Sequence, residues 1–247
     1  MKPGHLILLV IIIMAFFSCR GKAPQNAQDT QSAQNNVLSS EEKKQGWELL
    51  FDGQTINGWR FFKGGEIAGW KVVDGILCNS GVGSDHGGDI ITKEKYKDFE
   101  LSLEWKIDSM SNSGVFYHVQ ELDSVHAIYE SGPEYQLADD MNDPDPNTLS
   151  AQYTGANYGM NRPVGAVVKP LSEWNETRIV VKGPDVEHWL NGVKVVEYEL
   201  WSEDWKRRKS LGKWKDYPYY GIGEEGYIGL QDHGGLTCFR NIKVRRL

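Results

Sequence analysis

The chain has 247 residues, and 27 Lys and Arg against 34 Asp and Glu give it a formal net charge of −7. Its 40% apolar and 25% charged residues are typical of an ordered globular protein, with enough length for a sizeable core. A net negative charge argues against nucleic acid as the main partner, because phosphate binding requires clustered Lys and Arg. We therefore expect no nucleic-acid partner.

The N-terminus has the features of an export signal. Lys2 precedes an unbroken apolar run over residues 6–17, which is shorter than the ~20 residues that cross a bilayer and is typical of a secretory signal. Ser18 and Cys19 follow directly. A small residue before Cys resembles a bacterial lipoprotein signal, so we predict a signal peptide over residues 1–18 and lipidation of Cys19. The alternative is an ordinary signal peptide with an incidental Cys.

A polar stretch rich in Gln, Asn, Ser and Ala follows the predicted lipidation site. It has too few large apolar residues to offset the entropy of ordering the chain, so we predict a flexible tether over residues 19–45. The folded domain is then expected over residues 46–247. These features predict a protein in the cell envelope, held at the membrane by its lipid anchor, in the periplasm or at the outer membrane.

Two cysteines, Cys78 and Cys238, remain for the folded part. In an exported protein they can pair as a disulfide. Both also lie in apolar, strand-like contexts, where a free Cys behaves as a small core residue. The local sequence favours the second interpretation and leaves the first open.

The folded part reads as a succession of short strands separated by turn residues. Residues 99–108 alternate apolar and polar side chains, which is typical of a half-buried strand. Asn191-Gly192 between two apolar runs is a strong hairpin signal, because a type I′ turn requires two positive φ angles. Asp74-Gly75 marks a second hairpin. Further strands are expected at residues 47–51, 70–73, 76–78, 114–119, 134–137, 174–182, 186–190, 193–198, 227–231 and 237–244.

Helical signal is confined to residues 202–209, where a capping Ser and acidic residues precede basic ones. Many strands without alternating helices predict an all-β fold. We expect two antiparallel sheets packed as a jelly-roll sandwich, with this one short helix.

Eight segments in a fixed order then resemble a known family. They are GWELLFDGQTINGW (46–59), WKVVDGIL (70–77), YKDFELSLEWKI (96–107), SNSGVFYHV (111–119), GPEYQLADD (132–140), WNETRIVVKG (174–183), HWLNGVKV (188–195) and EGYIGLQDHGGLTCFRNIKV (225–244). In this order they are similar to the 3-keto-disaccharide hydrolase domain family, formerly a domain of unknown function.

The resemblance implies a concanavalin-like, laminin-G-like sandwich that acts on glycosides whose C3 hydroxyl has been oxidised to a ketone. It also implies exported lipoproteins of carbohydrate-degrading bacteria. The chain departs from the family at His118, where many relatives have Arg. In relatives an acidic stretch with a His follows the segment that corresponds to Glu134-Tyr135-Gln136, and this chain lacks that His. Asp145 is the one residue of this loop to which the resemblance assigns a site role.

A 3-keto group makes the C2 hydrogen acidic, so loss of the C1 substituent becomes a β-elimination, and later addition of water gives net hydrolysis. This route requires a base near C2, a donor or cation for the enolate oxygen, and an acid for the leaving group. The polar run Gln231-Asp232-His233 after a predicted buried strand is the best candidate. Histidine can act as a base or metal ligand, and Asp232 can orient it.

The other candidates come from further strands and loops. Glu134 and Gln136 share one strand face, and we expect His233, Glu134 and Asp232 to be the catalytic group. The predicted substrate-binding residues are Gln136, Tyr158, Glu104, Gln231 and His118. For each, the alternative is a structural role in a turn, a core or a solvated sheet face.

A divalent metal ion is an expected cofactor, with His233, Glu134 and Asp145 as its candidate ligands, and no organic cofactor is expected. The predicted function is cleavage of 3-keto-glycosides, with a glycoside or oligosaccharide as the partner. The alternative is a non-catalytic carbohydrate-binding module on a lipid tether.

Overall fold

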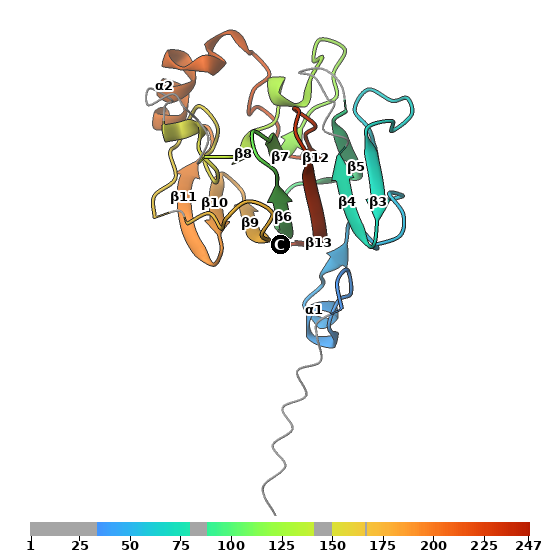
Figure 1. Ribbon diagram of the computed structural model, residues 1–247. Helices are drawn as coiled ribbons and strands as arrows, with labels where there is room; N and C mark the ends of the chain where they lie inside the picture. The colour runs from blue at the N-terminus through green and yellow to red at the C-terminus, as the bar shows by residue number, and fades with distance from the viewer. Residues whose placement is uncertain (1–33, 80–87, 141–149, 166) are drawn as a thin grey trace, which may run out of the picture. The chain divides into compact units, whose positions relative to one another are not determined.

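The computed structural model describes residues 34–79, 88–140, 150–165 and 167–247. Within these ranges the chain forms one eight-stranded and one five-stranded sheet, and every strand pair in them is antiparallel. The predicted all-β, two-sheet jelly-roll sandwich is confirmed (Figure 1).

The larger sheet contains β1 (Glu48–Leu49), β3 (Trp70–Val73), β4 (Ile76–Asn79), β6 (Phe99–Ile107), β9 (Asn175–Lys182), β10 (Asp185–Leu190), β11 (Val193–Glu199) and β13 (Thr237–Arg246). Their order is β11-β10-β9-β6-β13-β4-β3, and β1 pairs with β13. The smaller sheet contains β2 (Trp59–Phe61), β5 (Ile90–Tyr96), β7 (Asn112–Val119), β8 (Glu134–Ala138) and β12 (Gly226–Leu230). Their order is β2-β5-β12-β7-β8.

Alternation along β6 shows how the sequence builds the core. Phe99, Leu101, Leu103, Trp105 and Ile107 are buried between the sheets, as their spacing predicts. The opposing sheet contributes the buried residues Val115, Tyr117, Ile228 and Leu230. The predicted hairpin turns also form: Asn191 and Gly192 have φ angles of 49° and 81°, and Asp74 and Gly75 have 51° and 75°.

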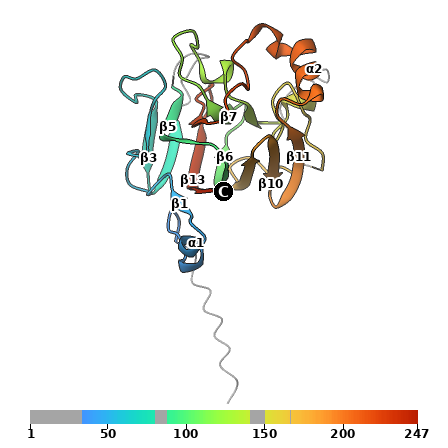
Figure 2. The same ribbon diagram turned by 180° about the vertical axis from the view of Figure 1, so that it is seen from behind.

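The helices differ from the prediction in number. The predicted helix forms as α2 (Glu203–Leu211), where the Ser202 hydroxyl accepts a hydrogen bond from Trp205 N at 3.2 Å. A second helix, α1 (Ser40–Lys44), begins after a capping box made by Ser39 and Glu42. The two helices lie at opposite ends of the fold (Figures 1 and 2).

The predicted tether is too long at its C-terminal end. Asn36 is 6% exposed and exchanges hydrogen bonds with Asn241 of β13, and its Nδ2 donates to Gly75 O at 2.8 Å. Glu42 of α1 also pairs with Lys243 of β13. A polar segment can therefore be ordered through hydrogen bonds and an ion pair, which its low apolar content did not indicate. Cys19 and the rest of residues 1–33 lie outside the described residues.

Cys78 of β4 and Cys238 of β13 form a disulfide. The expectation of two free core cysteines is wrong, because the two residues are direct partners across the ladder, with Cα atoms 4.1 Å apart. Their pairing joins positions separated by 160 residues. Local sequence context carries no information on such a distant partner.

None of the helices formed by the described residues combines the length and the apolar character that a membrane crossing requires.

Replacing both cysteines by Ala should lower the free energy of unfolding by about 2–4 kcal/mol, because the disulfide restricts the unfolded chain. Denaturant unfolding of Cys78→Ala/Cys238→Ala against the oxidised protein measures this difference. The reduced wild-type protein serves as the control and should unfold close to the variant. Equal midpoints for variant and oxidised protein would show that the bond does not form in solution.

Candidate active site

The candidate site lies on the face of the five-stranded sheet that is turned away from the sandwich interior. Gln231 N donates to Gly114 O at 3.1 Å, and Gly114 lies directly opposite Gln136. These residues therefore lie side by side across three neighbouring chain segments. Glu134, two residues before Gln136 on β8, points to the same face, whereas Tyr135 between them is buried in the core.

The Glu134 carboxyl group lies directly over the backbone of Gly114. A Cβ added at residue 114 would be 2.4 Å from Glu134 Oε1, 2.9 Å from its Cγ and 2.8 Å from Phe116 Cε2, so only glycine leaves room for the Glu134 side chain in this position. The Glu134 side chain is 5% exposed in this position. The absence of a side chain at Gly114 thus makes room for a buried carboxyl group.

A second wall comes from residues 153–161, which run beside β8. Gln136 N donates to Ala156 O at 3.2 Å, and Tyr158 N donates to Glu134 O at 3.0 Å, so Tyr158 is held next to Glu134. Trp214 Nε1 donates to Tyr158 O at 2.9 Å. Trp214 belongs to the turn η3 (Lys213–Asp216), and this contact brings Lys213 Nζ within 4.4 Å of the centre of the Tyr158 ring.

A buried polar chain supports the same wall from behind. His188 is fully buried, and burial lowers its pKa to about 4, so the imidazole is neutral. Its Nδ1 lies 3.0 Å from Gly155 O and must carry the proton, since a carbonyl oxygen only accepts. Nε2 therefore accepts from the Tyr117 hydroxyl at 3.0 Å. His188 also packs against Tyr135, with ring centres 4.9 Å apart.

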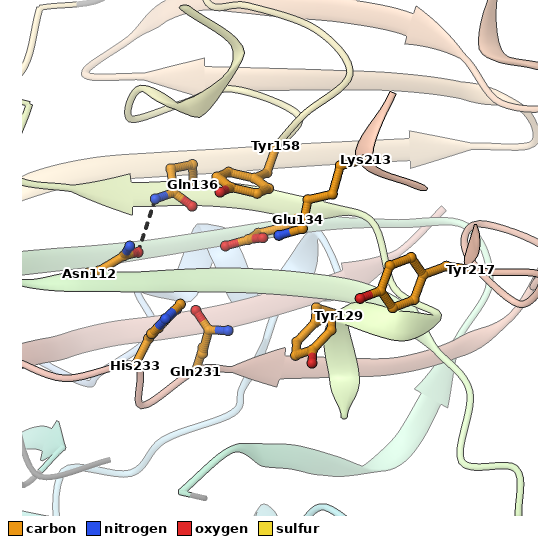
Figure 3. A pocket seen from close by; sticks show the side chains of 9 residues that line it. All are labelled: Asn112, Tyr129, Glu134, Gln136, Tyr158, Lys213, Tyr217, Gln231 and His233. Carbon is orange, nitrogen blue, oxygen red and sulfur yellow. Dashed lines mark hydrogen bonds between the residues drawn. The ribbon is translucent and has the colours of Figure 1, made fainter. Parts of the chain in front are cut away.

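Nine side chains enclose a pocket of about 260 Å³ (Figure 3). They are Asn112, Tyr129, Glu134, Gln136, Tyr158, Lys213, Tyr217, Gln231 and His233. Figure 3 shows Asn112 and His233 at one end, Tyr129 and Tyr217 at the other, and Glu134 and Lys213 between them. At the first end, Gln136 Nε2 donates to Asn112 Oδ1 at 3.0 Å, which fixes both amides.

Burial controls the charge of the central acid. It raises the pKa of Glu134 to about 8, while the Lys213 ammonium opposes this shift and the Asp89 carboxylate adds to it. Glu134 is therefore largely protonated at neutral pH and can donate a proton. Burial raises the pKa of the Tyr158 hydroxyl, and the negative charge that Glu134 carries once it has lost its proton raises this pKa further, so the hydroxyl group stays neutral.

The structure brings together most of the predicted site. His233, Glu134, Gln136, Tyr158 and Gln231 all line the one pocket. His233 is exposed at its rim, because two glycines with positive φ, Gly234 and Gly235, turn the chain immediately after it. Asp145, the third candidate metal ligand, lies outside the described residues.

Asp232 lies apart from the pocket that its two neighbours line. Its Oδ1 accepts a hydrogen bond from Asn79 Nδ2 of β4 at 3.0 Å, and the side chain is 1% exposed. The extended chain alternates direction, so Gln231 and His233 face the pocket while Asp232 faces the opposite sheet. Its backbone N donates to Asp89 Oδ1 at 3.1 Å. Asp232 thus lies outside the pocket and is hydrogen-bonded to β4, and its predicted catalytic role stays a prediction.

Glu104 and His118 also lie away from the residues that line the pocket, and their predicted role in substrate binding stays a prediction. Glu104 belongs to the other sheet, where its Oε2 accepts from Arg240 Nε at 2.6 Å and its Oε1 from Asn241 Nδ2 at 2.9 Å. His118 is 1% exposed, and its Nε2 donates to Lys97 O at 2.8 Å. The prediction for His118 assumed that side chains alternate regularly along β7, but His118 has a positive φ of 52°, which interrupts this alternation.

Four pocket residues are absent from the predicted set. Asn112 precedes Gly114 at the start of β7, in a motif that also reads as an ordinary turn. Lys213, Tyr129 and Tyr217 come from turns between elements, where no periodicity indicates a direction. Their shared location depends on long-range packing, such as the contact of Tyr129 and Tyr217 with ring centres 6.1 Å apart.

The residues that line this pocket do not by themselves make a metal centre. Among the described residues, no three His, Cys, Asp or Glu side chains are grouped closely enough to hold an ion. Of these ligand types the pocket lining offers the His233 imidazole and the Glu134 carboxyl group. The predicted metal ion stays a prediction, and no chemical step is derived through it.

The fold and the pocket define an all-β sandwich with a polar and aromatic cleft on one sheet face. Residues 46–245 match the family described as the 3-keto-alpha-glucoside-1,2-lyase-like domain. The chain belongs to this family, which confirms the family resemblance seen in the sequence.

Individual relatives agree with this assignment. A protein of Bacteroides thetaiotaomicron named 3-keto-disaccharide hydrolase is 35% identical over 272 aligned positions, covering 93% of each chain. A crystal structure of a putative glycosyl hydrolase from Parabacteroides distasonis is 42% identical, with a TM-score of 0.81 over 87% of this chain and 100% of that one. A second putative glycosyl hydrolase of that species is 31% identical, with a TM-score of 0.65 over 81% of this chain and 99% of that one.

Gly114→Ala should displace the Glu134 carboxyl group and lower kcat/KM by about a hundredfold, because a misplacement of about 1 Å is enough for such a loss. Kinetics with a 3-keto-glycoside measure the change, and circular dichroism checks the fold. Gly229→Ala on β12 is the matched control, since no atom would lie closer than 3.3 Å to its added Cβ. Equal kcat/KM for the two variants would mean that the seat at Gly114 has no catalytic role.

Proposed function

We propose that this protein cleaves the glycosidic bond of 3-keto-glycosides by β-elimination followed by addition of water. The observation that carries the proposal is one pocket lined by an exposed imidazole, His233, and a buried carboxyl group, Glu134. Burial raises the pKa of this carboxyl group to about 8, which suits it to donate a proton. A relative named 3-keto-disaccharide hydrolase and the family description support the same substrate class.

In the first half-reaction, the His233 imidazole takes the proton from C2 of the sugar. The electron pair moves onto the C3 oxygen as an enolate, then returns to form the C1–C2 double bond as the C1–O bond breaks. Glu134 donates its proton to the departing oxygen. The products are an unsaturated 3-keto sugar and the free alcohol, and the His233 imidazolium keeps the C2 proton.

Neighbouring side chains stabilise the charges that this step creates. The amide groups of Gln231 and Asn112 line the same end of the pocket as His233 and can donate to the enolate oxygen. The Lys213 ammonium favours the carboxylate that Glu134 becomes after donating its proton. Addition of water then places hydroxide on C1 and returns a proton to C2, which gives net hydrolysis.

We also propose that the protein is exported and held at the membrane through a lipid on Cys19, in the periplasm or at the outer membrane. The apolar run and Ser18-Cys19 in the sequence support this location. The disulfide between Cys78 and Cys238 is in keeping with it, because such bonds persist in oxidising compartments.

Incubation with a 3-keto-glucoside and with its unoxidised parent should give turnover of the ketone alone, because only the ketone makes the C2 hydrogen acidic. His233→Ala should abolish this turnover while leaving thermal unfolding nearly unchanged, since His233 is exposed. His126→Ala is the control, as His126 is also exposed but does not line the pocket. Turnover of neither compound by the wild-type protein would favour a non-catalytic carbohydrate-binding module.

The value of kcat/KM should fall as the pH rises through about 8, because Glu134 acts in its protonated form and its pKa is about 8. Above that point the decline is roughly tenfold per pH unit. Glu134→Gln should lower kcat by about 100- to 10,000-fold, and Glu176→Gln on the other sheet is the matched control. Activity that increases through pH 8 would assign Glu134 as the base instead.

Protein stability provides an independent check on the protonation of Glu134. Its pKa is raised from 4.5 to about 8 on folding, so its contribution to stability is fully present below pH 4.5 and is lost as the pH rises through 8. The free energy of unfolding of Glu134→Gln should therefore increase relative to wild type between pH 5 and pH 9. A constant difference would mean that the folded state does not raise this pKa.

A further inference from the structure

The two ends of the pocket differ in chemistry, and this difference bears on the substrate class of the proposed reaction. One end is lined by the amides of Asn112 and Gln231 and by the His233 imidazole, whereas Tyr129 and Tyr217 line the other (Figure 3). Glu134 and Lys213 lie between these ends. A substrate that spans the pocket therefore meets two distinct surfaces, with the acid at their boundary.

The polar end has the properties of the sugar-binding part. Gln231 is 5% exposed, and its Oε1 is buried without a hydrogen-bond donor among the residues that the structure describes. A buried acceptor without a donor costs free energy, and a sugar hydroxyl placed in the pocket removes that cost. His233 at the same end is then next to the carbon-bound proton that the proposed mechanism removes.

The opposite end has the properties of a stacking surface. Tyr129 belongs to the turn η1 (Ile128–Glu130) and Tyr217 follows η3, and their rings meet edge to face with centres 6.1 Å apart. Tyr217 is in turn packed edge to face against Trp214, with centres 5.5 Å apart. Packing of this kind fixes the orientation of the rings before a ligand arrives, which lowers the entropy cost of binding.

We infer that Tyr129 and Tyr217 form the subsite for the leaving group, and that it selects leaving groups with a flat face of carbon and hydrogen. This inference rests on the proposed function, because Glu134 must protonate the leaving oxygen at the boundary of the two ends. An aryl ring and the hydrogen-bearing face of a second sugar both have such a face. A small alkyl group such as methyl does not reach or cover the tyrosine rings.

The test measures binding of phenyl, glucosyl and methyl 3-keto-glucosides of one anomer by calorimetric titration. His233→Ala is the background, because it lacks the proposed base and should not consume the ligand, and His233 lies at the end of the pocket away from the two tyrosines. Adding Tyr129→Ala or Tyr217→Ala should weaken binding of the phenyl or the glucosyl compound at least about tenfold more than that of the methyl compound. The compound that loses more identifies which flat face the subsite accepts.

Tyr129→Phe and Tyr217→Phe are the matched controls, since each keeps the ring and removes only the hydroxyl group. They should retain the preference over the methyl compound. Equal losses for all three ligands, no loss for any of them, or a loss in the Phe variants as large as in the Ala variants would each overturn the inference.

The outcome is separable from that of the proposed function. Absence of turnover by the wild-type protein would contradict the proposed reaction, whereas the ligand preference is read from binding and would still be measured. Conversely, normal turnover with no selective effect of the tyrosine variants would leave the reaction intact and remove the subsite. Thermal unfolding of each variant verifies that the η1 and η3 turns remain folded.

Discussion

The site depends on the seating of one carboxyl group against the backbone of a neighbouring strand. Glu134 occupies the space that any side chain at residue 114 would fill, with 2.4 Å between Oε1 and the position of an added Cβ. A carboxyl group held there loses most of its contact with water, and loss of solvation favours its neutral form. The absence of a side chain at Gly114 thus determines both where the Glu134 carboxyl group lies and which protonation state its burial favours.

A column of stacked aromatic side chains supports one wall of the pocket. Tyr198, Trp205, Tyr220 and Trp214 are stacked in succession, with ring-centre distances of 5.5, 5.6 and 4.1 Å. This column ends at Trp214, which holds both Tyr158 and the turn that carries Lys213. The pocket wall that contains Tyr158 and Lys213 is therefore supported by large, rigid side chains, as a preorganised binding site requires.

The sequence predicted those features that depend on neighbouring residues. The alternation of apolar and polar residues predicted β6, and Asn191-Gly192 predicted the hairpin between β10 and β11. Both are predictable because side-chain direction and turn geometry are local properties. The same alternation rule also indicates opposite directions for Asp232 and His233, although the catalytic assignment grouped them. Applied consistently, it predicts that Asp232 faces the other sheet, which is where the structure places it.

Other features could not be predicted because they depend on distant partners. The bond between Cys78 and Cys238 follows from the pairing of β4 with β13, which no local pattern encodes. Lys213 and Tyr129 reach the pocket from turns whose course is set by packing. His118 resembles a member of a regular strand in sequence, but its left-handed backbone conformation turns it toward Lys97.

The attachment of the N-terminal segment to β13 also determines how the fold responds to mechanical force. A pull on the chain before residue 34 reaches the sandwich first through the Asn36–Asn241 contacts and the Glu42–Lys243 pair. Both load β13, which the covalent bond at Cys238 ties to β4. Tension therefore enters strands of the larger sheet and is shared across a cross-link, while Glu134 and Gln136 lie on the edge strand of the other sheet, outside that load path.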